Sequence, residues 1–330
     1  MKRRLSLRQV ASLAARVGAL ALVFTLFALL VPEGRFVDVR NVENILVQSA
    51  VVSAAAIGAT LVIITAGIDL SVGSVVALTV VVIARVLRAG PNDPSALWAL
   101  LAVLAGVGAG TLVGLLNAAL ITSLRIVPFI VTLGTLQIIR GLAKGAAGNA
   151  AISAPETWIN PMLDSVRQQP WHWVQLPPGV WLVLVLALLT ALMLRYTVLG
   201  RHIFAIGSNE KTARLCGVSI WRTRLIVYTL AGFFAGVAGI LQYSYIGLGD
   251  PTTAVGLELA VIAAVVIGGG SLMGGEGTIS GTIIGALIIG VLGAGGVLMG
   301  WPKWIQEVMT GGIIVAAVAI DQVRQRAILR

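Results

Sequence analysis

The sequence contains few charged residues and almost no cysteine or histidine. Only 11% of its 330 residues are Asp, Glu, Lys or Arg, and 58% are hydrophobic. A typical soluble domain has roughly 25% charged residues, so this composition is that of an integral membrane protein. Cys216, His172 and His202 lie far apart in the sequence. We therefore expect neither a disulfide framework nor a metal site.

Several catalytic motifs are also missing. The sequence has no G-x-x-x-x-G-K-[ST] loop to hold nucleotide phosphates, no G-x-S-x-G nucleophile turn and no H-E-x-x-H zinc motif. It also lacks a pair of acidic residues placed for acid–base chemistry at an external face. These absences predict that the chain is not an enzyme and binds no cofactor itself.

Long apolar runs fill most of the chain. Several reach the ~20 residues that a membrane-spanning helix needs. Others are shorter and interrupted by glycine, which favours broken or re-entrant helices. We expect an all-α membrane fold with eight to ten spans, ten being preferred. The runs lie near residues 17–31, 45–66, 74–87, 96–122, 126–139, 180–194, 225–246, 257–268, 278–299 and 305–320.

The net charge of +10 is explained by where the cations lie. They gather before the first run, around a central polar segment and after the last run, as the positive-inside rule requires of cytoplasmic segments. The pattern therefore predicts a cytoplasmic tail at 1–16, a cytoplasmic loop at 199–224 and a cytoplasmic tail at 321–330, and it does not indicate nucleic-acid binding. Of the 23 Lys and Arg residues, 14 lie in these three places: Lys2, Arg3, Arg4, Arg8, Arg16, Arg195, Arg201, Lys211, Arg214, Arg222, Arg224, Arg324, Arg326 and Arg330.

No Ser- or Pro-rich linker divides the chain, so residues 1–330 are expected to form one membrane domain. The basic N-terminus resembles a signal peptide, but no small-x-small cleavage site follows it, which favours an uncleaved first span. The segment 149–178 is expected outside, with Trp158, Trp171 and Trp173 at the membrane interface. Residues 45–148 and 225–320 would have opposite orientations, which suggests an inverted repeat.

The central segment from Leu199 to Arg224 is polar and basic in an otherwise apolar chain, a composition that suits contact with a soluble partner protein. Asn209 can cap a short helix, Glu210 is favourable in its first turn, and Gly217 can end it about two turns later. Such a helix is on the order of 10 Å long, too short to cross a membrane. We interpret it as a short projecting helix that binds another protein.

Two glycine-rich stretches, 65–74 and 267–278, break apolar runs. Asp69 lies in the first. A charged side chain at membrane depth costs about 2.5–3.5 kcal/mol by insertion scales, which points to function. A structural role is the stronger interpretation: Gly67 can end one helix and Asp69 can cap the next through the amides near Ser71 and Val72.

Other polar residues interrupt the apolar segments. Asn117, Gln137 and Gln242 can hydrogen-bond a hydroxylated solute, although bonds between helices are about as common. Glu258 begins an apolar run, where it can cap the helix or pair with a neighbouring subunit. Arg140 and Lys144 are expected to extend to lipid head groups or to shape an entrance. The candidates for a translocation path or helix break are therefore Asp69, Ser71, Asn117, Gln137, Gln242 and Glu258.

Four stretches together resemble the membrane subunits of bacterial ribose-type ABC importers, a group for ribose, xylose, arabinose, galactose and related solutes. These are ITAGIDLSVGS at 64–74, VTLGTLQIIRG at 131–141, and the segments 200–218 and 258–291, and the resemblance runs from about Asn44 to Asp321. It implies a bacterial inner-membrane permease that pairs with a second copy or a paralogue. It also implies a cytoplasmic ATPase, which carries the ATP and Mg²⁺, and a periplasmic sugar-binding protein.

The resemblance also assigns a role to the central segment. Its matching residues resemble the coupling helix that docks on the ATPase; they are Gly207, Asn209, Glu210, Ala213, Arg214 and Gly217. Small departures are Ser208, Cys216 and Gly270, where Gly, Ser and Thr are common. The implied mechanism is alternating access, with ATP drawing the coupling helices together.

Alternatives remain at this point. An ion-coupled secondary transporter would use Asp69 and the glycine breaks as its ion site. A branched-chain amino acid permease has related architecture, although the GIDLSVGS stretch favours the sugar group. A scaffold subunit would have no solute path. The sequence does not identify the solute.

Overall fold

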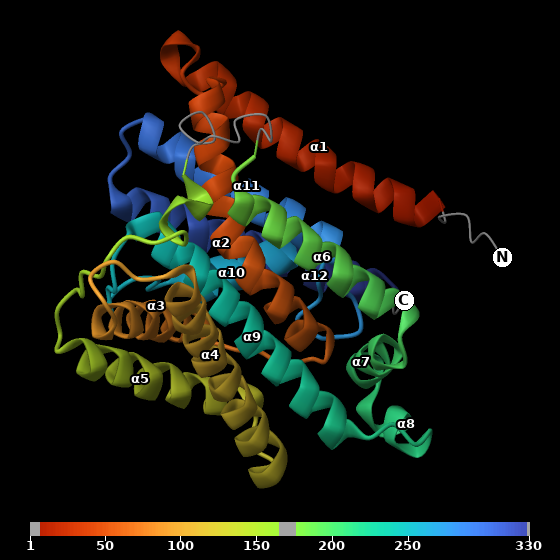
Figure 1. The fold of residues 1–330 in the computed structure, drawn as a ribbon. Helices are drawn as coiled ribbons and strands as arrows, with labels where there is room; N and C mark the ends of the chain where they lie inside the picture. The colour runs from red at the N-terminus through yellow and green to blue at the C-terminus, as the bar shows by residue number, and fades with distance from the viewer. Residues whose placement is uncertain (1–6, 165–175, 329–330) are drawn as a thin grey trace.

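The computed structural model describes residues 7–164 and 176–328, which are helical apart from loops and one isolated bridge between Ile152 and Gly249 (Figure 1). Trp171 and Trp173 of the expected external segment lie outside the described residues. The α-helices are α1 (Leu7–Leu30), α2 (Val39–Ile64), α3 (Val72–Ala89), α4 (Ala96–Leu124), α5 (Pro128–Ala147), α6 (Pro178–Tyr196), α7 (Val198–Ser208), α8 (Glu210–Leu215), α9 (Ile220–Ile246), α10 (Leu257–Ile267), α11 (Ile279–Leu298) and α12 (Lys303–Ile328). Short 3-10 helices, η1 (Pro32–Gly34) and η2 (Asn160–Leu163), lie in two of the loops.

Each apolar run of the sequence lies in a helix, which confirms the all-α membrane fold. Among the described residues, seven helices are long and apolar enough to cross a membrane: α1, α2, α3, α4, α6, α9 and α11. The run at 257–268 forms the shorter apolar helix α10. The runs at 126–139 and 305–320 lie in α5 and α12, which are outside that group of seven. The chain is thus a multi-pass membrane protein, and the full count of ten spans stays a prediction.

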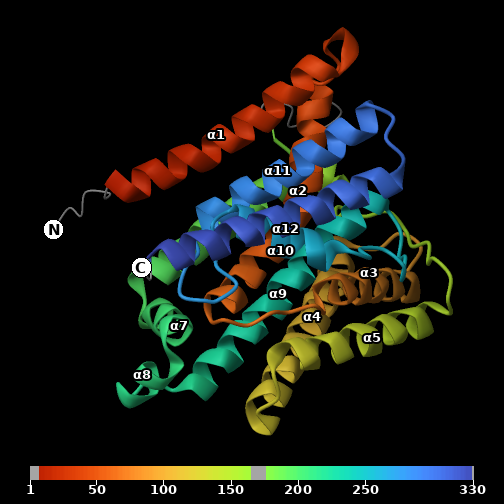
Figure 2. The same ribbon diagram turned by 180° about the vertical axis from the view of Figure 1, so that it is seen from behind.

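Helix α9 lies at the centre and packs against α4, α2 and α3 (Figures 1 and 2). Glycine permits its closest contact: a Cβ on Gly232 would overlap the carbonyl of Gly110 and the backbone of Gly114, both in α4. Small residues let helix backbones approach and pack where lipid removes the hydrophobic driving force. These glycines therefore allow α4 and α9 to pack closely.

Helix α1 lies along the outside of the bundle, with only 6% of its apolar window buried (Figures 1 and 2). Near its C-terminal end Phe27 packs against Phe36 and Trp301. Arg16 donates a hydrogen bond to the Thr278 hydroxyl at 2.9 Å. Helix α1 begins at Leu7 and α12 runs to Ile328, so parts of both expected tails are helical, and their cytoplasmic location stays a prediction.

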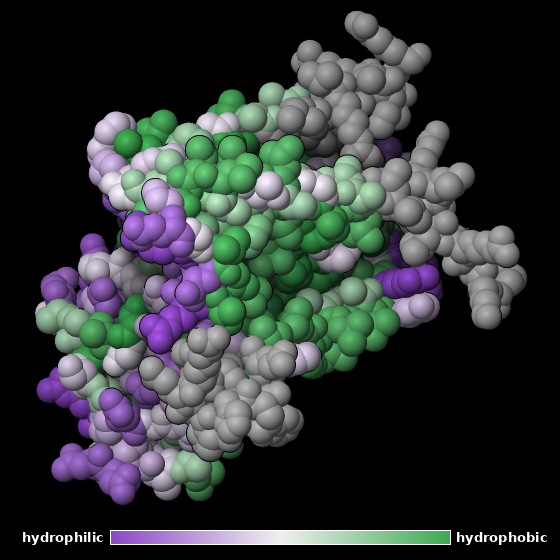
Figure 3. All heavy atoms as spheres, turned by 90° about the horizontal axis from the view of Figure 1, so that it is seen from above, coloured by the Kyte–Doolittle hydropathy of each residue, from purple (hydrophilic) through white to green (hydrophobic). Residues whose placement is uncertain are grey.

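The start of α1, the end of α12 and the helices α7 and α8 lie at the same side of the molecule, which we call the α8 side (Figures 1 and 2). In the space-filling view, hydrophobic residues cover the middle of the visible face, and hydrophilic residues gather mainly at one end (Figure 3). This distribution is that of a protein whose apolar middle contacts lipid and whose polar end contacts water.

Candidate coupling site

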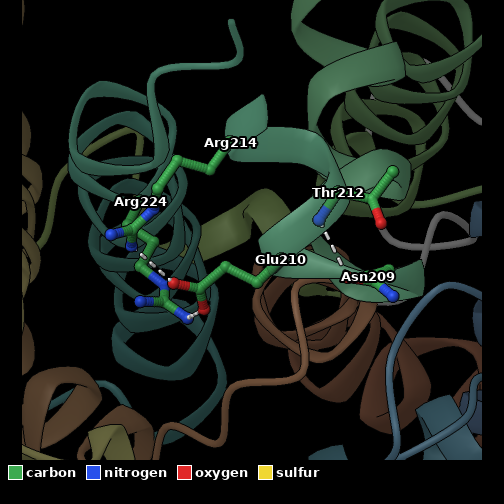
Figure 4. A network of polar contacts seen from close by, with 5 residues as sticks. All are labelled: Asn209, Glu210, Thr212, Arg214 and Arg224. Atoms are coloured by element: carbon green, nitrogen blue, oxygen red, sulfur yellow. Dashed lines mark hydrogen bonds and ion pairs between the residues drawn. The ribbon is translucent and has the colours of Figure 1, made fainter. Parts of the chain in front are cut away.

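The short helix expected from the central segment is present as α8 (Figure 4). The Asn209 side chain accepts a hydrogen bond from the Thr212 amide at 2.9 Å, which caps the helix as expected. Gly217 follows its end with φ +83°, a left-handed conformation that favours glycine. The Gly217 amide donates to the Arg214 carbonyl at 3.0 Å. Residues 209–217 alone therefore account for where this helix begins and ends.

Glu210 also ties α8 to the start of α9 (Figure 4). One carboxylate oxygen lies 3.0 Å from Arg214 Nη2, one helical turn away, and the other lies 2.7 Å from Arg224 Nη2 of α9. Arg224 was not among the predicted site residues, because its pairing spans fourteen positions and depends on the turn between the two helices. Glu210 thus holds α8 in place in addition to any contact with a partner.

The two sides of α8 differ in exposure. Ala213 is 4% exposed and packs in a small apolar cluster with Ile206 and Ile220, which fixes α8 on its neighbours. Leu215 at the helix end is 89% exposed. Sequence reasoning missed Leu215, because an apolar residue among charges gives no sign of which way it faces. A fixed, polar helix with an exposed leucine has the features of a protein-docking element.

Gly207 occupies a different environment from the other residues of the predicted coupling set. It lies in the last turn of α7, against the carbonyl of Ile64 and the amide of Gly275. Only Asn209, Glu210, Ala213, Arg214 and Gly217 belong to α8 and its two ends. The predicted set therefore divides into a projecting helix and one glycine beside the bundle.

Three of the predicted path residues come together between α2, α3 and α4. The Asp69 carboxylate accepts hydrogen bonds from the Ser71 amide at 2.8 Å and the Ser71 hydroxyl at 2.6 Å. Asn117 of α4 donates to the same hydroxyl at 2.9 Å. All three side chains are buried. The Asp69 carboxylate thus binds Ser71 in the turn that leads into α3, as the structural interpretation expects, and a role of Asp69 in transport stays a prediction.

Tyr228 of α9 lies beside this turn, where a Cβ on Gly67 would overlap its hydroxyl. The ring is 1% exposed, and neither the Tyr228 hydroxyl nor the Asn117 carbonyl oxygen has a hydrogen-bond partner among the described residues. Sequence reasoning did not select Tyr228, because a tyrosine in an apolar helix is common. The turn around Asp69 therefore retains unused hydrogen-bonding capacity.

The remaining path candidates, Gln242, Glu258 and Gln137, do not bond to this turn. Gln242 donates to the Thr253 hydroxyl at 2.8 Å. Arg140 donates to the carbonyls of Pro251 and Thr253 at 3.1 and 2.6 Å. Arg140 is therefore held on the loop before α10, and whether it also reaches lipid head groups or shapes an entrance stays a prediction.

Glu258 lies in the first turn of α10, against Gly73 of α3, and makes no side-chain cap. Gln137 is exposed on α5 and is separate from both clusters. The six path candidates therefore do not form one cluster of hydrogen-bonded residues. Three meet at the turn after α2, Gln242 bonds from α9 to the loop before α10, Glu258 lies at the start of α10, and Gln137 lies on an exposed face of α5.

Comparison with known proteins identifies the family. A family model described as the branched-chain amino acid transport system permease component matches residues 41–318. A ribose import permease protein of Escherichia coli (strain K12) is 36% identical over 311 residues, covering 93% of this chain and 92% of that protein.

Two further relatives have comparable similarity. An L-arabinose ABC transporter permease protein of Azospirillum brasilense is 35% identical and covers 92% of this chain and 85% of its own. A fructose import permease protein of Rhizobium meliloti is 36% identical, with coverage of 93% and 85%. No solved structure matches. The chain therefore belongs to the family of bacterial ABC importer permeases that includes the ribose, arabinose and fructose permeases.

Proposed function

We propose that this protein is the transmembrane subunit of an ATP-driven importer in the bacterial inner membrane, with α8 as its docking element for a separate ATPase subunit. The observation that carries the proposal is the structure of α8: a capped helix held by Glu210 and Ala213, with Leu215 exposed at its end. A helix ordered before binding loses little conformational entropy on docking.

The α8 side is proposed to be cytoplasmic. Lys211, Arg214 and Arg222 are exposed there, and the chain termini, also rich in arginine, follow or precede helices that end at the same side. Cations concentrate in cytoplasmic segments of inner-membrane proteins. The ATPase subunit, with its ATP and Mg²⁺, would then contact α8 directly, and this chain would hold no nucleotide.

The proposed cargo is a sugar or a related polyhydroxylated small molecule. Relatives named for ribose, arabinose and fructose support the class, and an autoinducer 2 permease of Photorhabdus luminescens, 36% identical over 275 residues, extends it beyond simple sugars. A soluble sugar-binding protein would deliver the cargo at the opposite side. A second permease subunit, identical or paralogous, would complete the path.

The mechanism we propose is alternating access. ATP binding would draw two partner ATPase domains together, and each would displace the α8 seated on it. The displacement would rock the helices around α9 and open the central path to the opposite side. Hydrolysis would reverse the motion. In this scheme α8 transmits movement and takes part in no bond cleavage.

Ion-coupled transport through Asp69 is the competing function. The two hydrogen bonds from Ser71 to Asp69 favour a structural carboxylate over an ion carrier, because they already occupy one of its oxygens. An ion-coupled carrier would also need no docking element such as α8.

Uptake of a panel of labelled pentoses, hexoses and polyols by the host, compared with a strain lacking this gene, tests the proposal. Gene-dependent uptake should stop when ATP is depleted with arsenate and should persist when a protonophore collapses the ion gradient. Uptake that stops with the protonophore while ATP is maintained would reject it.

A further inference from the structure

Gly207 lies where three segments of the chain meet. A Cβ on this residue would overlap the carbonyl oxygen of Ile64 and the amide nitrogen of Gly275. These two groups are bonded to each other, with the Gly275 amide donating to the Ile64 carbonyl at 2.9 Å. Ser208, the next residue of α7, also lies against Gly275. Only a glycine allows the end of α7 to lie on this hydrogen bond.

The two segments at Gly207 are the two glycine-rich breaks of the sequence. Ile64 ends α2 at the start of the first break, and Gly275 lies in the second. Ala66 and Gly274 pack directly on each other at left-handed conformations, with φ of +59° and +86°. Two breaks separated by about 200 residues thus form one contact beside Gly207, which is three positions before the first residue of α8.

The first break leads from this contact to the helices on one side of α9. The Ile68 carbonyl accepts a hydrogen bond from the Thr132 hydroxyl of α5 at 3.2 Å. Ser71 is bonded to Asn117 of α4, as described above. A displacement of the first break would therefore act on α4 and α5 through hydrogen bonds already formed.

The second break leads to a different group of helices. Gly268 packs against the backbone of Gly281 in α11, and Thr278, the cap of α11, accepts the bond from Arg16 of α1. The two breaks together therefore connect the end of α7 with α1, α4, α5 and α11.

We propose that Gly207 is the positioning residue through which displacement of α8 reaches both glycine-rich breaks, and that it does not contact the ATPase. The inference rests on the proposed function and assigns partner binding and the transfer of movement to different residues. The side chains of α8 bind the partner, whereas the backbone contact of Gly207 with Ile64 and Gly275 transfers the movement. Because close-packed backbone groups have little freedom to deform independently, a shift of the α7 end must shift both breaks.

Gly207→Ala tests this division in the complete complex, reconstituted in liposomes with the host's ATPase and binding protein. The added methyl group would separate α7 from the Ile64–Gly275 contact while leaving α8 unchanged. We expect ATPase affinity within two-fold of wild type, continued ATP hydrolysis, and at least a ten-fold loss of solute imported per ATP. Gly145→Ala is the matched control, because that α5 glycine has open space around its Cβ position.

A second measurement needs no variant at the contact. Backbone hydrogen exchange in peptides covering 64–66 and 273–276 should change between the nucleotide-free wild-type complex and the complex trapped with ATP. Unchanged exchange there, or normal import per ATP in Gly207→Ala, would overturn the inference while α8 docking stood. A wild-type chain that recruits no ATPase would instead overturn the proposed function, and this inference with it.

Discussion

The ion pair between Glu210 and Arg224 should contribute to partner binding without contacting the partner. The perturbation is Glu210→Gln, which keeps the shape of the side chain and removes its charge. Both pairs of Glu210 are then weakened: the one with Arg214 within α8 and the one with Arg224 of α9. Loss of these pairs lets α8 leave its docking position.

The magnitude follows from exposure. Arg214 is 69% exposed and its pair with Glu210 is of the i,i+4 type, worth about 0.3–0.5 kcal/mol. Arg224 is 25% exposed and Glu210 37%, so solvent still screens the second pair and about 0.5–1 kcal/mol is appropriate. The sum is about 1 kcal/mol, which corresponds to about a five-fold loss of affinity for the ATPase subunit.

The assay is a double-mutant cycle of Glu210→Gln and Arg224→Gln, with ATPase affinity measured by biolayer interferometry on the detergent-purified permease. The two losses should be non-additive by about 0.5–1 kcal/mol, and the coupling should shrink at high salt. Arg222→Gln is the control, because Arg222 is exposed and forms no ion pair among the described residues. Strictly additive losses would refute the claim that this pair orders α8.

Three further outcomes are expected. Leu215→Ser should leave thermal stability unchanged, because the Leu215 side chain is 89% exposed. The same substitution should weaken ATPase binding about ten-fold or more, because it removes about 1.5–3 kcal/mol of apolar burial at the interface. The control Val255→Ser, at a side chain that is 76% exposed, should leave binding unchanged. Gly232→Leu should lower the melting temperature in detergent by overpacking the α4–α9 contact, whereas Gly108→Leu, with open space at its Cβ, should not. Asp69→Ala should destabilise the fold by about 1–3 kcal/mol, because it removes the acceptor of both Ser71 hydrogen bonds. Asp69→Asn keeps an acceptor oxygen and should retain uptake. Loss of uptake in a stable Asp69→Asn protein would support the ion-coupled alternative.

The features that the sequence predicted well are local. The cap of Asn209, the helix end at Gly217 and the bond from the Ser71 amide to the Asp69 carboxylate each involve residues within a few positions of one another. Such contacts depend on backbone geometry that neighbouring residues determine. The apolar runs likewise predicted helices, because run length and hydrophobicity are properties of single segments.

The features that the sequence did not predict involve contacts between distant segments. Arg140 was expected at lipid head groups or at an entrance, and nothing in the sequence indicated its bonds to carbonyls more than 100 residues later in the chain. The contact of Gly207 with Ile64 and Gly275 joins three segments that were each considered separately. Periodicity and capping patterns carry no information on which helices become neighbours, so these contacts required the fold.

The decisive experiment is to purify this chain from its own host in mild detergent and to assay the preparation for bound protein and ATP hydrolysis. We expect a soluble ATPase to co-purify with the wild-type chain. We expect the ATPase to be lost in Glu210→Lys, which places a cation against Arg214 and Arg224, while the variant remains in the membrane. A wild-type preparation without an ATPase, whose uptake in liposomes depends on an ion gradient alone, would show that the protein is not an ATP-driven importer subunit.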